Sequence, residues 1–167
     1  MAKITTELFE EILEIYSLWK ELDLRLRKVS SRGVNIHEGI SEIIVCYVNG
    51  FEHSVGRGSE DAFTDLGEQV QIKATSNYND DLTSFGPRSQ FDLLHFARLD
   101  KLNDVFYLYD IPLEDLNETY VNKTQTFREQ QMQGRRPRFS IINKFIEPRN
   151  LDYYASVDLR TGQITRK

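Results

Sequence analysis

The sequence predicts an α/β (α+β) protein, and three observations support this class. Apolar residues recur at three- and four-residue steps near the N-terminus, as in an amphipathic helix. Polar and apolar residues alternate from Gln69 to Ala74, as in a strand. The 167 residues are 40% hydrophobic, with no repeat or long linker, so we expect one domain with a real core over residues 1–167.

Two helices are predicted in the first 50 residues. The first runs from Thr5 to about Lys28 and ends in the polar tail Ser30–Gly33. The second, from His37 to Val48, is more apolar, ends at Asn49-Gly50 and is expected to pack centrally. It carries the single cysteine, Cys46, which we expect to be a buried structural residue. The apolar stripe predicted for the first helix comprises Leu8, Ile12, Ile15, Trp19, Leu22 and Leu26.

A β-hairpin is predicted next. Short extended segments around Ala62-Phe63 and from Glu68 to Thr75 are separated by a turn at Gly67. The alternation in the second segment assigns its side chains to two faces. The core face holds Val70, Ile72 and Ala74, and the opposite face holds Gln69, Gln71 and Lys73.

Further helices and strands are predicted after the hairpin. After a polar loop from Ser76 to Gly86, a helix is expected from about Ser89 to Leu99, followed by a buried strand from Asp104 to Ile111. More polar elements follow. They are a helical turn at Pro112, a polar helix from Thr124 to Gln133, and extended segments from Arg138 to Ile146 and from Tyr153 to Ile164, the last with a turn at Thr161-Gly162.

Charge is unevenly divided along the chain. Residues 120–167 carry ten Lys and Arg against four Asp and Glu, a net of +6, whereas residues 1–119 carry eleven against twenty-two, a net of −11. Together they give the formal net charge of −5. A basic C-terminal region can hold a phosphate backbone, and the acidic part contains carboxylates that can bind cations. The alternative is that these charges are only solvated surface.

The sequence argues against a membrane-spanning segment and against a zinc site. The N-terminus lacks a basic start followed by an apolar stretch, and no run of about 18 apolar residues occurs, so we expect a cytoplasmic protein with no membrane partner. His37, His53 and His95 share no spacing typical of metal ligands, which argues against zinc.

The candidate chemistry lies in the predicted hairpin. Asp61 stands ten positions before Gln71, and Gln71 and Lys73 leave the same face of the strand. Asp61 could give a carboxylate, Gln71 a side-chain carbonyl and Ile72 a backbone carbonyl to Mg2+, which prefers oxygen ligands. The Lys73 ammonium could orient an attacking water and offset charge on a phosphate.

Each of these assignments has an alternative. Asp65 or Glu68 would replace Asp61 as the ligand if the turn had another shape. Lys73 on a strand face could also be a solvated surface residue.

These residues resemble a nuclease motif. Glu60-Asp61 followed by Gln71-Ile72-Lys73 is similar to the PD-(D/E)xK motif in the variant where glutamine replaces the second acid. Two positions depart from the motif, because Glu60 stands where the motif has proline and Gln71 is uncharged. A wider set of segments, over most of the chain, is similar to a small group of type II restriction endonucleases associated with the interrupted palindrome GCNGC. These segments are Ser41, Asp61-Ala62, Gln71–Ser76, Thr83–Pro87, Phe91-Asp92, Gln125–Phe127 and Gly134–Phe139.

The resemblance implies a fold and an activity. It implies a restriction-endonuclease-like mixed sheet flanked by helices, with a catalytic core at about residues 36–111. It also implies Mg2+-dependent hydrolysis of double-stranded DNA to 5′-phosphate ends at a GC-rich site. Glu42 would be the additional acid on the second helix, although Glu38, one turn earlier on the same face, competes for this role.

Partners and rival functions follow from the same resemblance. Cutting both strands of a palindrome favours a homodimer. A structure-selective or modification-dependent nuclease with the same core is one alternative. A noncatalytic DNA-binding module is another.

Candidate DNA contacts lie outside the catalytic strand, in two segments. Arginine side chains suit the O6 and N7 atoms of guanine, and glutamine amides suit adenine. The alternative is an exposed Gln-rich helix whose neighbouring arginines pair with surface carboxylates. The candidates are Asn77, Asn79, Ser84, Arg88 and Ser89 after the catalytic strand, and Gln125, Arg128, Gln131, Arg135, Arg136 and Arg138 in the basic C-terminal region.

Overall fold

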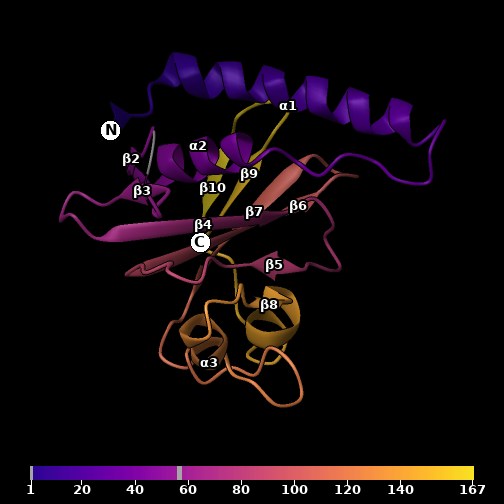
Figure 1. Cartoon of the computed structure of the whole chain (residues 1–167). Helices are drawn as coiled ribbons and strands as arrows, with labels where there is room; N and C mark the ends of the chain where they lie inside the picture. Colours follow the sequence, from indigo (N-terminus) through magenta and orange to yellow (C-terminus); the bar gives the residue numbers. More distant parts are fainter. Residues whose placement is uncertain (1, 56–57) are drawn as a thin grey trace.

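A mixed eight-stranded sheet organises the protein. The computed structural model describes residues 2–55 and 58–167 (Figure 1). Strand order is β1-β2-β3-β4-β6-β7-β9-β10, in which β4 (Gln69–Thr75) and β6 (Leu93–Asp100) are parallel and the other neighbours antiparallel. The α/β (α+β) prediction is therefore confirmed. The other strands are β1 (Ala2–Lys3), β2 (Glu52–His53), β3 (Ala62–Phe63), β7 (Val105–Ile111), β9 (Ala155–Asp158) and β10 (Ile164–Arg166).

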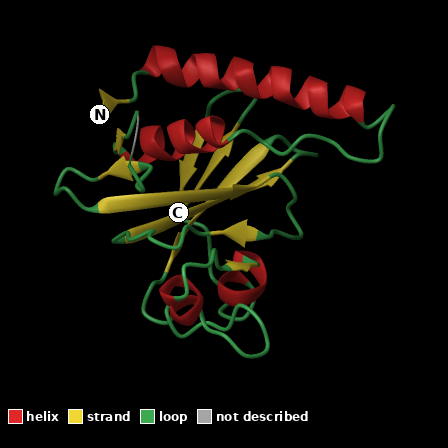
Figure 2. Ribbon diagram, in the orientation of Figure 1, coloured by secondary structure: helices red, strands yellow, loops and turns green. Residues whose placement is uncertain are grey.

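Helices cover both faces of this sheet (Figure 2). The two long helices, α1 (Thr6–Leu26) and α2 (Glu38–Asn49), lie on one side. The opposite side carries α3, a π-helical turn η1 and a small second sheet, β5-β8. Their bounds are α3 (Phe127–Met132), η1 (Ile142–Ile146), β5 (Thr83–Ser84) and β8 (Arg138–Phe139). In the described part of the chain, no helix has both the length and the apolar character needed to cross a bilayer.

The ends of α1 and α2 follow local sequence signals. The Thr5 hydroxyl accepts a hydrogen bond from the Leu8 amide at 3.2 Å and caps α1. The His37 ring nitrogen Nδ1 accepts one from the Gly39 amide at 3.1 Å, and Gly50 ends α2 in the left-handed conformation with φ 68°. Both predicted N-terminal helices are confirmed.

β6 is the central strand, and the prediction of a helix over Ser89–Leu99 is wrong. Leu94 and Phe96 face the hydrophobic cluster on the α3 side, whereas Ala97 and Leu99 face the cluster under α1 and α2. A strand buried on both faces is apolar throughout and does not alternate. Its apolar residues therefore also fit a helical period, and sequence periodicity alone cannot separate the two cases.

The C-terminal region is less regular than predicted. The polar helix is limited to α3, which begins with a capping box formed by Thr126 and Glu129. The predicted extended segment Arg138–Ile146 is extended only at β8 and then turns into η1. The Asp81 carboxylate stabilises this turn, since it accepts hydrogen bonds from the Ser140 hydroxyl and from the next two backbone amides. The predicted turn at Thr161-Gly162 joins β9 and β10 into a hairpin, as expected.

The buried face of α1 differs from the predicted stripe. Four side chains on α1 are buried hydrophobic residues, namely Phe9, Ile12, Tyr16 and Trp19. The Phe9 ring stacks on Tyr47 of α2 with 4.1 Å between centroids. Phe9, Tyr16 and Trp19 bury more apolar surface than the aliphatic residues of the predicted stripe, so the helix is rotated to turn them toward the core. The predicted burial of Leu8, Ile15 and Leu22 is therefore wrong, because all three are exposed.

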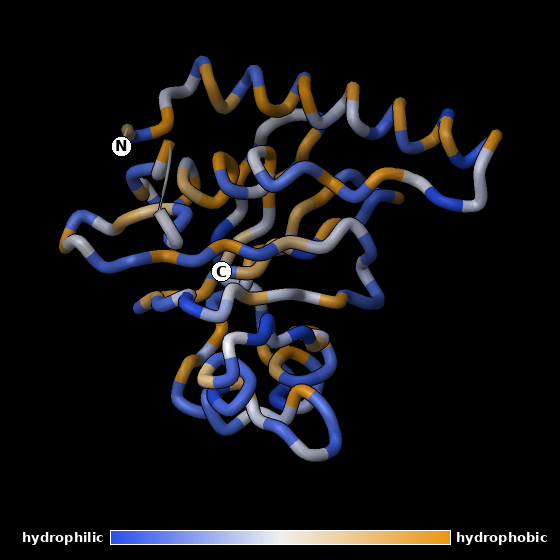
Figure 3. Tube along the Cα trace, viewed as in Figure 1, coloured by the Kyte–Doolittle hydropathy of each residue, from blue (hydrophilic) through white to orange (hydrophobic). Residues whose placement is uncertain are grey.

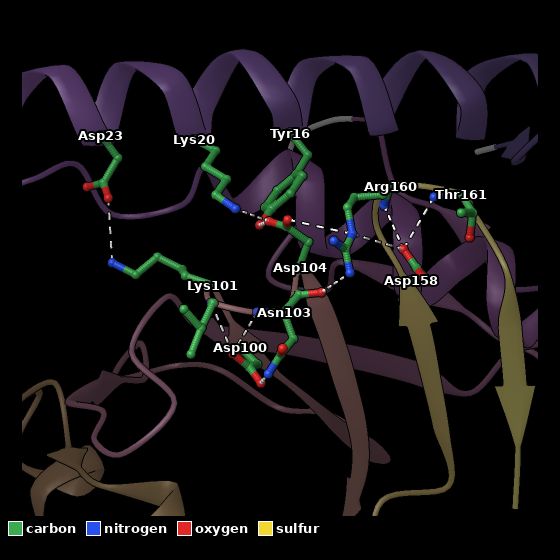
Figure 4. Close-up of polar contacts among 11 residues, drawn as sticks. Tyr16, Lys20, Asp23, Asp100, Lys101, Asn103, Asp104, Asp158, Arg160 and Thr161 are labelled. Carbon is green, nitrogen blue, oxygen red and sulfur yellow. Dashed lines mark hydrogen bonds and ion pairs between the residues drawn. The ribbon is translucent and has the colours of Figure 1, made fainter.

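Polar contacts hold α1 to the turn between β6 and β7 (Figure 4). The Tyr16 hydroxyl donates to Asp104 Oδ1 at 2.7 Å, and the Lys20 ammonium reaches the same oxygen at 2.5 Å. Burial and the Asp104 carboxylate raise the pKa of Tyr16 above its usual range, so the hydroxyl keeps its proton and remains a donor. Arg160 adds an ion pair at 3.8 Å to the other oxygen of Asp104.

Candidate active site

The β3-β4 hairpin positions Asp61, Gln71 and Lys73. Asp61 immediately precedes β3, and its backbone is fixed on both sides: its amide donates to the Val70 carbonyl at 3.0 Å, and its carbonyl accepts from the Ser54 amide at 2.9 Å. Gln71 and Lys73 leave β4 on the face opposite the α1 and α2 cluster, into which Val70 and Ile72 pack. The hairpin and the two faces of β4 agree with the sequence-based prediction.

The Asp61 carboxylate joins the components of the predicted metal site. Its Oδ2 atom accepts hydrogen bonds from the Ile72 amide at 2.6 Å and from the Gln71 side-chain amide. Oδ1 accepts none from the residues that the structure describes. Because Gln71 directs its nitrogen to Asp61, its side-chain oxygen stays available to another partner. The Ile72 carbonyl leaves the strand on the same side as the Ile72 amide, which is the side of Asp61.

Burial sets the charge state of Asp61 and Lys73. Burial raises the pKa of Asp61 to about 6, with a further increase from Glu42, against hydrogen bonds from Ile72 and Gln71 and the charge of Lys73. Burial lowers the pKa of Lys73 below its usual range, with a further decrease from Arg136, although the charge of Asp61 opposes it. A perturbed acid and a perturbed base next to each other are typical of a functional site.

Phe85 explains part of the burial of Lys73. The Lys73 nitrogen lies 5.5 Å from the centroid of the Phe85 ring, at a cation–π distance. Phe85 is fully buried, and its ring stacks on Phe139 of β8 with 5.6 Å between centroids. The small β5-β8 sheet thus supports the lysine. Phe85 lies in the Thr83–Pro87 segment of the resemblance, but the sequence analysis gave it no role at the site.

Glu42 forms a hydrogen bond that the sequence does not reveal. Its Oε2 atom lies 2.8 Å from Nε2 of His53 in β2, and both side chains are largely buried. Glu42 raises the pKa of Asp61 and supports the charged form of Lys73. Glu38, by contrast, is exposed, and its charge raises the pKa of Lys73 but is not among the causes of the Asp61 shift. No sequence spacing relates His53 to this site, because it arrives there through the pairing of β2 with β3.

The two alternative carboxylates face elsewhere. Asp65 pairs with Lys3 of β1, and Glu68 accepts a hydrogen bond from the Thr64 hydroxyl at 3.0 Å. Within the described ranges, no three His, Cys, Asp or Glu residues are grouped so that they could hold a metal ion. The donors gathered at Asp61 are instead one carboxylate, one amide oxygen and one backbone carbonyl.

A polar cleft opens beside Lys73. It has a volume of about 480 Å³, and its wall includes Asn35, Asn77, Ser84 and Arg138. Ser84 and Arg138 are opposite each other in the β5-β8 pair. Three candidate DNA contacts, Asn77, Ser84 and Arg138, thus share one cleft with Lys73. Asn35, on the loop before α2, was missed because nothing in its local sequence distinguishes it from other loop residues.

The three arginines that follow α3, up to the first residue of β8, are exposed. Gly134, with φ 71°, turns the chain after α3 and presents Arg135, Arg136 and Arg138. None of the three forms an ion pair with a carboxylate in the described residues. The alternative interpretation, in which these arginines pair with surface carboxylates, is therefore not observed among the described residues.

Other candidate DNA contacts lie apart from this cleft. The Gln131 amide donates to the backbone carbonyls of Gly86 at 2.9 Å and Ser89 at 3.2 Å, so it ties α3 to the loop after β5. Gln125 bonds to two neighbouring glutamines, Gln130 and Gln133. The remaining candidates are exposed. They are Asn79, which borders a groove adjoining the cleft, Arg128, which lines a separate groove, and Arg88.

Comparison with known proteins gives two matches. The family model described as Bsp6I restriction endonuclease matches residues 4–148, a range that contains the hairpin, the cleft and the arginines. A curated relative, the type II restriction enzyme Bsp6I of Bacillus sp. (strain RFL6), is 42% identical over 166 residues. The alignment covers 98% of this chain and 95% of that relative.

Proposed function

The chain belongs to the Bsp6I restriction endonuclease family, and on this basis we propose that it is a type II site-specific deoxyribonuclease with its active site at Asp61, Gln71 and Lys73. The observation that carries the proposal is the contact of the Asp61 carboxylate with the Gln71 amide and the Ile72 backbone, next to a buried lysine. The 480 Å³ polar cleft beside that lysine offers a path for DNA to the site.

The donor set fits Mg2+. Asp61 Oδ1, the Gln71 side-chain oxygen and the Ile72 carbonyl are all hard oxygen donors, and Mg2+ needs only one or two carboxylates because it keeps several waters. When bound, Mg2+ would lower the pKa of an attacking water and stabilise the charge that develops on the phosphate. We propose these three residues as the metal ligands of a PD-(D/E)xK-type site.

Lys73 and Glu42 act beside these ligands. The lowered pKa of Lys73 brings its ammonium closer to the range in which it can orient a water and exchange a proton with it, and its charge offsets that of the phosphate. Glu42 is the helix acid in this proposal. Its contact with His53 holds the carboxylate in place on α2.

The finer properties of the reaction belong to the same proposal. We propose cleavage of double-stranded DNA at GCNGC, with 5′-phosphate ends, by a homodimer that cuts both strands of the palindrome. The exposed arginines and the cleft residues would hold the phosphate backbone and read bases.

Incubation of the purified protein with plasmid DNA, with and without Mg2+, tests this function. We expect a fixed set of fragments only when Mg2+ is present. A structure-selective or modification-dependent nuclease would give fragments that depend on DNA structure or methylation. A noncatalytic module would bind the plasmid with a steep salt dependence and leave it intact.

Gln71→Glu tests whether the side chain at this position is a ligand. The new carboxylate would face the Asp61 carboxylate. Two neighbouring negative charges repel each other, so activity should depend more strongly on a bound cation than it does in the wild type. We expect cleavage at saturating Mg2+ to stay within about tenfold of wild type, with a steeper dependence on Mg2+. Cleavage rates across a Mg2+ titration measure this. Complete loss with unchanged folding would show that the amide itself is required.

Arg138→Ala tests base reading in the cleft. If the Arg138 side chain binds a guanine edge, its loss costs about 1 to 3 kcal/mol on the specific site and little on random DNA. The same substitution at Arg135 and Arg136 completes the series, and we expect at least one of the three to discriminate. Binding to specific and random duplexes at several salt concentrations measures this. Equal weakening on both DNAs for all three variants would assign them to phosphate contacts alone.

A further inference from the structure

A second apolar stripe runs along α1 outside the buried one. Leu8, Ile15, Leu18 and Leu22 are 39%, 38%, 66% and 49% exposed. Their spacings of seven, three and four residues place them on one side of the helix. In Figure 3 hydrophobic positions recur along α1 on the side away from the sheet as well as on the side toward it.

The described part of the fold leaves this stripe only partly covered. The buried side of α1 is already filled by the Phe9, Ile12, Tyr16 and Trp19 side chains. The ion pairs and hydrogen bonds of Tyr16 and Lys20 with Asp104 also act on the inner side (Figure 4). A row of partly exposed aliphatic side chains next to a completed core is typical of a surface that another protein covers.

The charges along α1 indicate which protein fits. The first half of α1 carries no basic residue but four glutamates, namely Glu7, Glu10, Glu11 and Glu14. Among the described residues, none of these glutamates forms an ion pair. Arg25 in the last turn of α1, and Arg27 and Lys28 just after it, are basic. Arg25 and Arg27 each pair with an acid one turn earlier, Glu21 and Asp23, and the Arg25 side chain is still 74% exposed in its pair. An exposed pair such as Arg25–Glu21 is weak, so Arg25 can also contact a carboxylate of another molecule. The acidic first half of α1 is therefore complementary to the Arg25–Lys28 end of a second copy that runs antiparallel.

We propose that the outer stripe of Leu8, Ile15, Leu18 and Leu22 is the surface on which a second copy of this chain binds. The two α1 helices pack antiparallel about a twofold axis near Leu18, so that Glu7 and Glu11 of each copy lie along Lys28 and Arg25 of the other. The interface is argued from these side chains. Only its use, bringing together two sites that cut two strands, rests on the proposed function.

Leu18→Glu tests the interface, with Leu24→Glu as its matched control. Leu24 is also an exposed leucine of α1, at 53%, but lies about 120° around the helix from Leu18. The wild-type chain is expected to sediment as a dimer at micromolar concentration. Leu18→Glu places two carboxylates at the axis and should raise the dimer dissociation constant about a hundredfold or more. Leu24→Glu should leave it unchanged.

Charge reversal gives a second test that does not depend on one apolar residue. Glu11→Arg and Arg25→Glu should each weaken the dimer, and the double variant should restore it, because the two positions face each other across the axis. Circular dichroism verifies that all variants fold. A monomeric wild type, a dimer that Leu18→Glu leaves intact, or a double variant no tighter than the singles would each overturn the proposal.

Plasmid cleavage by the same samples separates this inference from the proposed function. If both hold, Leu18→Glu loses most double-strand cutting at concentrations where it is monomeric, and Leu24→Glu cuts as the wild type does. If the wild type is dimeric through α1 but cuts no DNA with Mg2+, only the proposed function fails. If the wild type cuts both strands as a monomer, the interface and the homodimer fail, whereas site-specific cleavage at Asp61, Gln71 and Lys73 stands.

Discussion

Lys73→Ala and Asp61→Ala are each expected to abolish DNA cleavage while leaving DNA binding within about tenfold of wild type. Asp61 supplies the carboxylate that contacts both Gln71 and Ile72, and Lys73 supplies the ammonium beside it. Both act on the reacting phosphate and water, whereas groove and backbone contacts come from other residues. Cleavage under single-turnover conditions and a gel-shift measurement of binding in the absence of Mg2+ give the two quantities.

Glu68→Ala is the matched control for this prediction. Glu68 lies in the same hairpin, but its carboxylate accepts a hydrogen bond from Thr64 and does not reach the Asp61 cluster. Its loss should leave the cleavage rate close to that of wild type. Near wild-type cutting by either Asp61→Ala or Lys73→Ala would remove that residue from the active site.

Asp81→Ala is expected to have the largest effect on stability. Asp81 is a buried carboxylate that accepts four hydrogen bonds: from the hydroxyls of Thr83 at 2.6 Å and Ser140 at 2.7 Å, and from the amides of Ile141 at 2.8 Å and Ile142 at 3.0 Å. Its removal leaves these donors without a partner and frees η1 from the loop before β5. We expect a loss of about 3 to 5 kcal/mol of unfolding free energy.

Chemical denaturation measures this loss, with Asp152→Ala as the control. Asp152 is also an aspartate with a lysine and backbone partner, but it is exposed on the surface, so its substitution should leave the denaturation midpoint nearly unchanged. Because Asp81 and Thr83 line the cleft beside Lys73, Asp81→Ala should also slow cleavage. A denaturation midpoint for Asp81→Ala equal to that of Asp152→Ala would contradict the role assigned to this carboxylate.

The parts of the site that could be predicted from the sequence are local. Asp61, Gln71, Ile72 and Lys73 belong to one hairpin, where turn position and strand alternation determine which side chains share a face. The two long helices were predictable for the same reason, since capping residues and apolar spacing are short-range signals. The face that α1 buries was not, because it depends on contacts such as that of Phe9 with Tyr47 of α2.

The missed features depend on contacts between distant segments. β6 could be identified as a strand only from its place between β4 and β7, which buries both of its faces. His53 reaches Glu42, 11 residues away in the sequence, through strand pairing. Asn35 reaches the cleft beside Lys73, 38 residues away, because the loop before α2 lies there. A single sequence contains no signal for such pairings.

The most direct measurement is the sequence at the ends of the fragments that the wild-type protein produces from plasmid DNA with Mg2+. If the Asp61, Gln71 and Lys73 site performs site-specific hydrolysis as proposed, every end will lie within the same short sequence, GCNGC, and will carry a 5′-phosphate. Ends scattered over unrelated sequences, or plasmid that stays intact while the protein binds it, would contradict the proposed function.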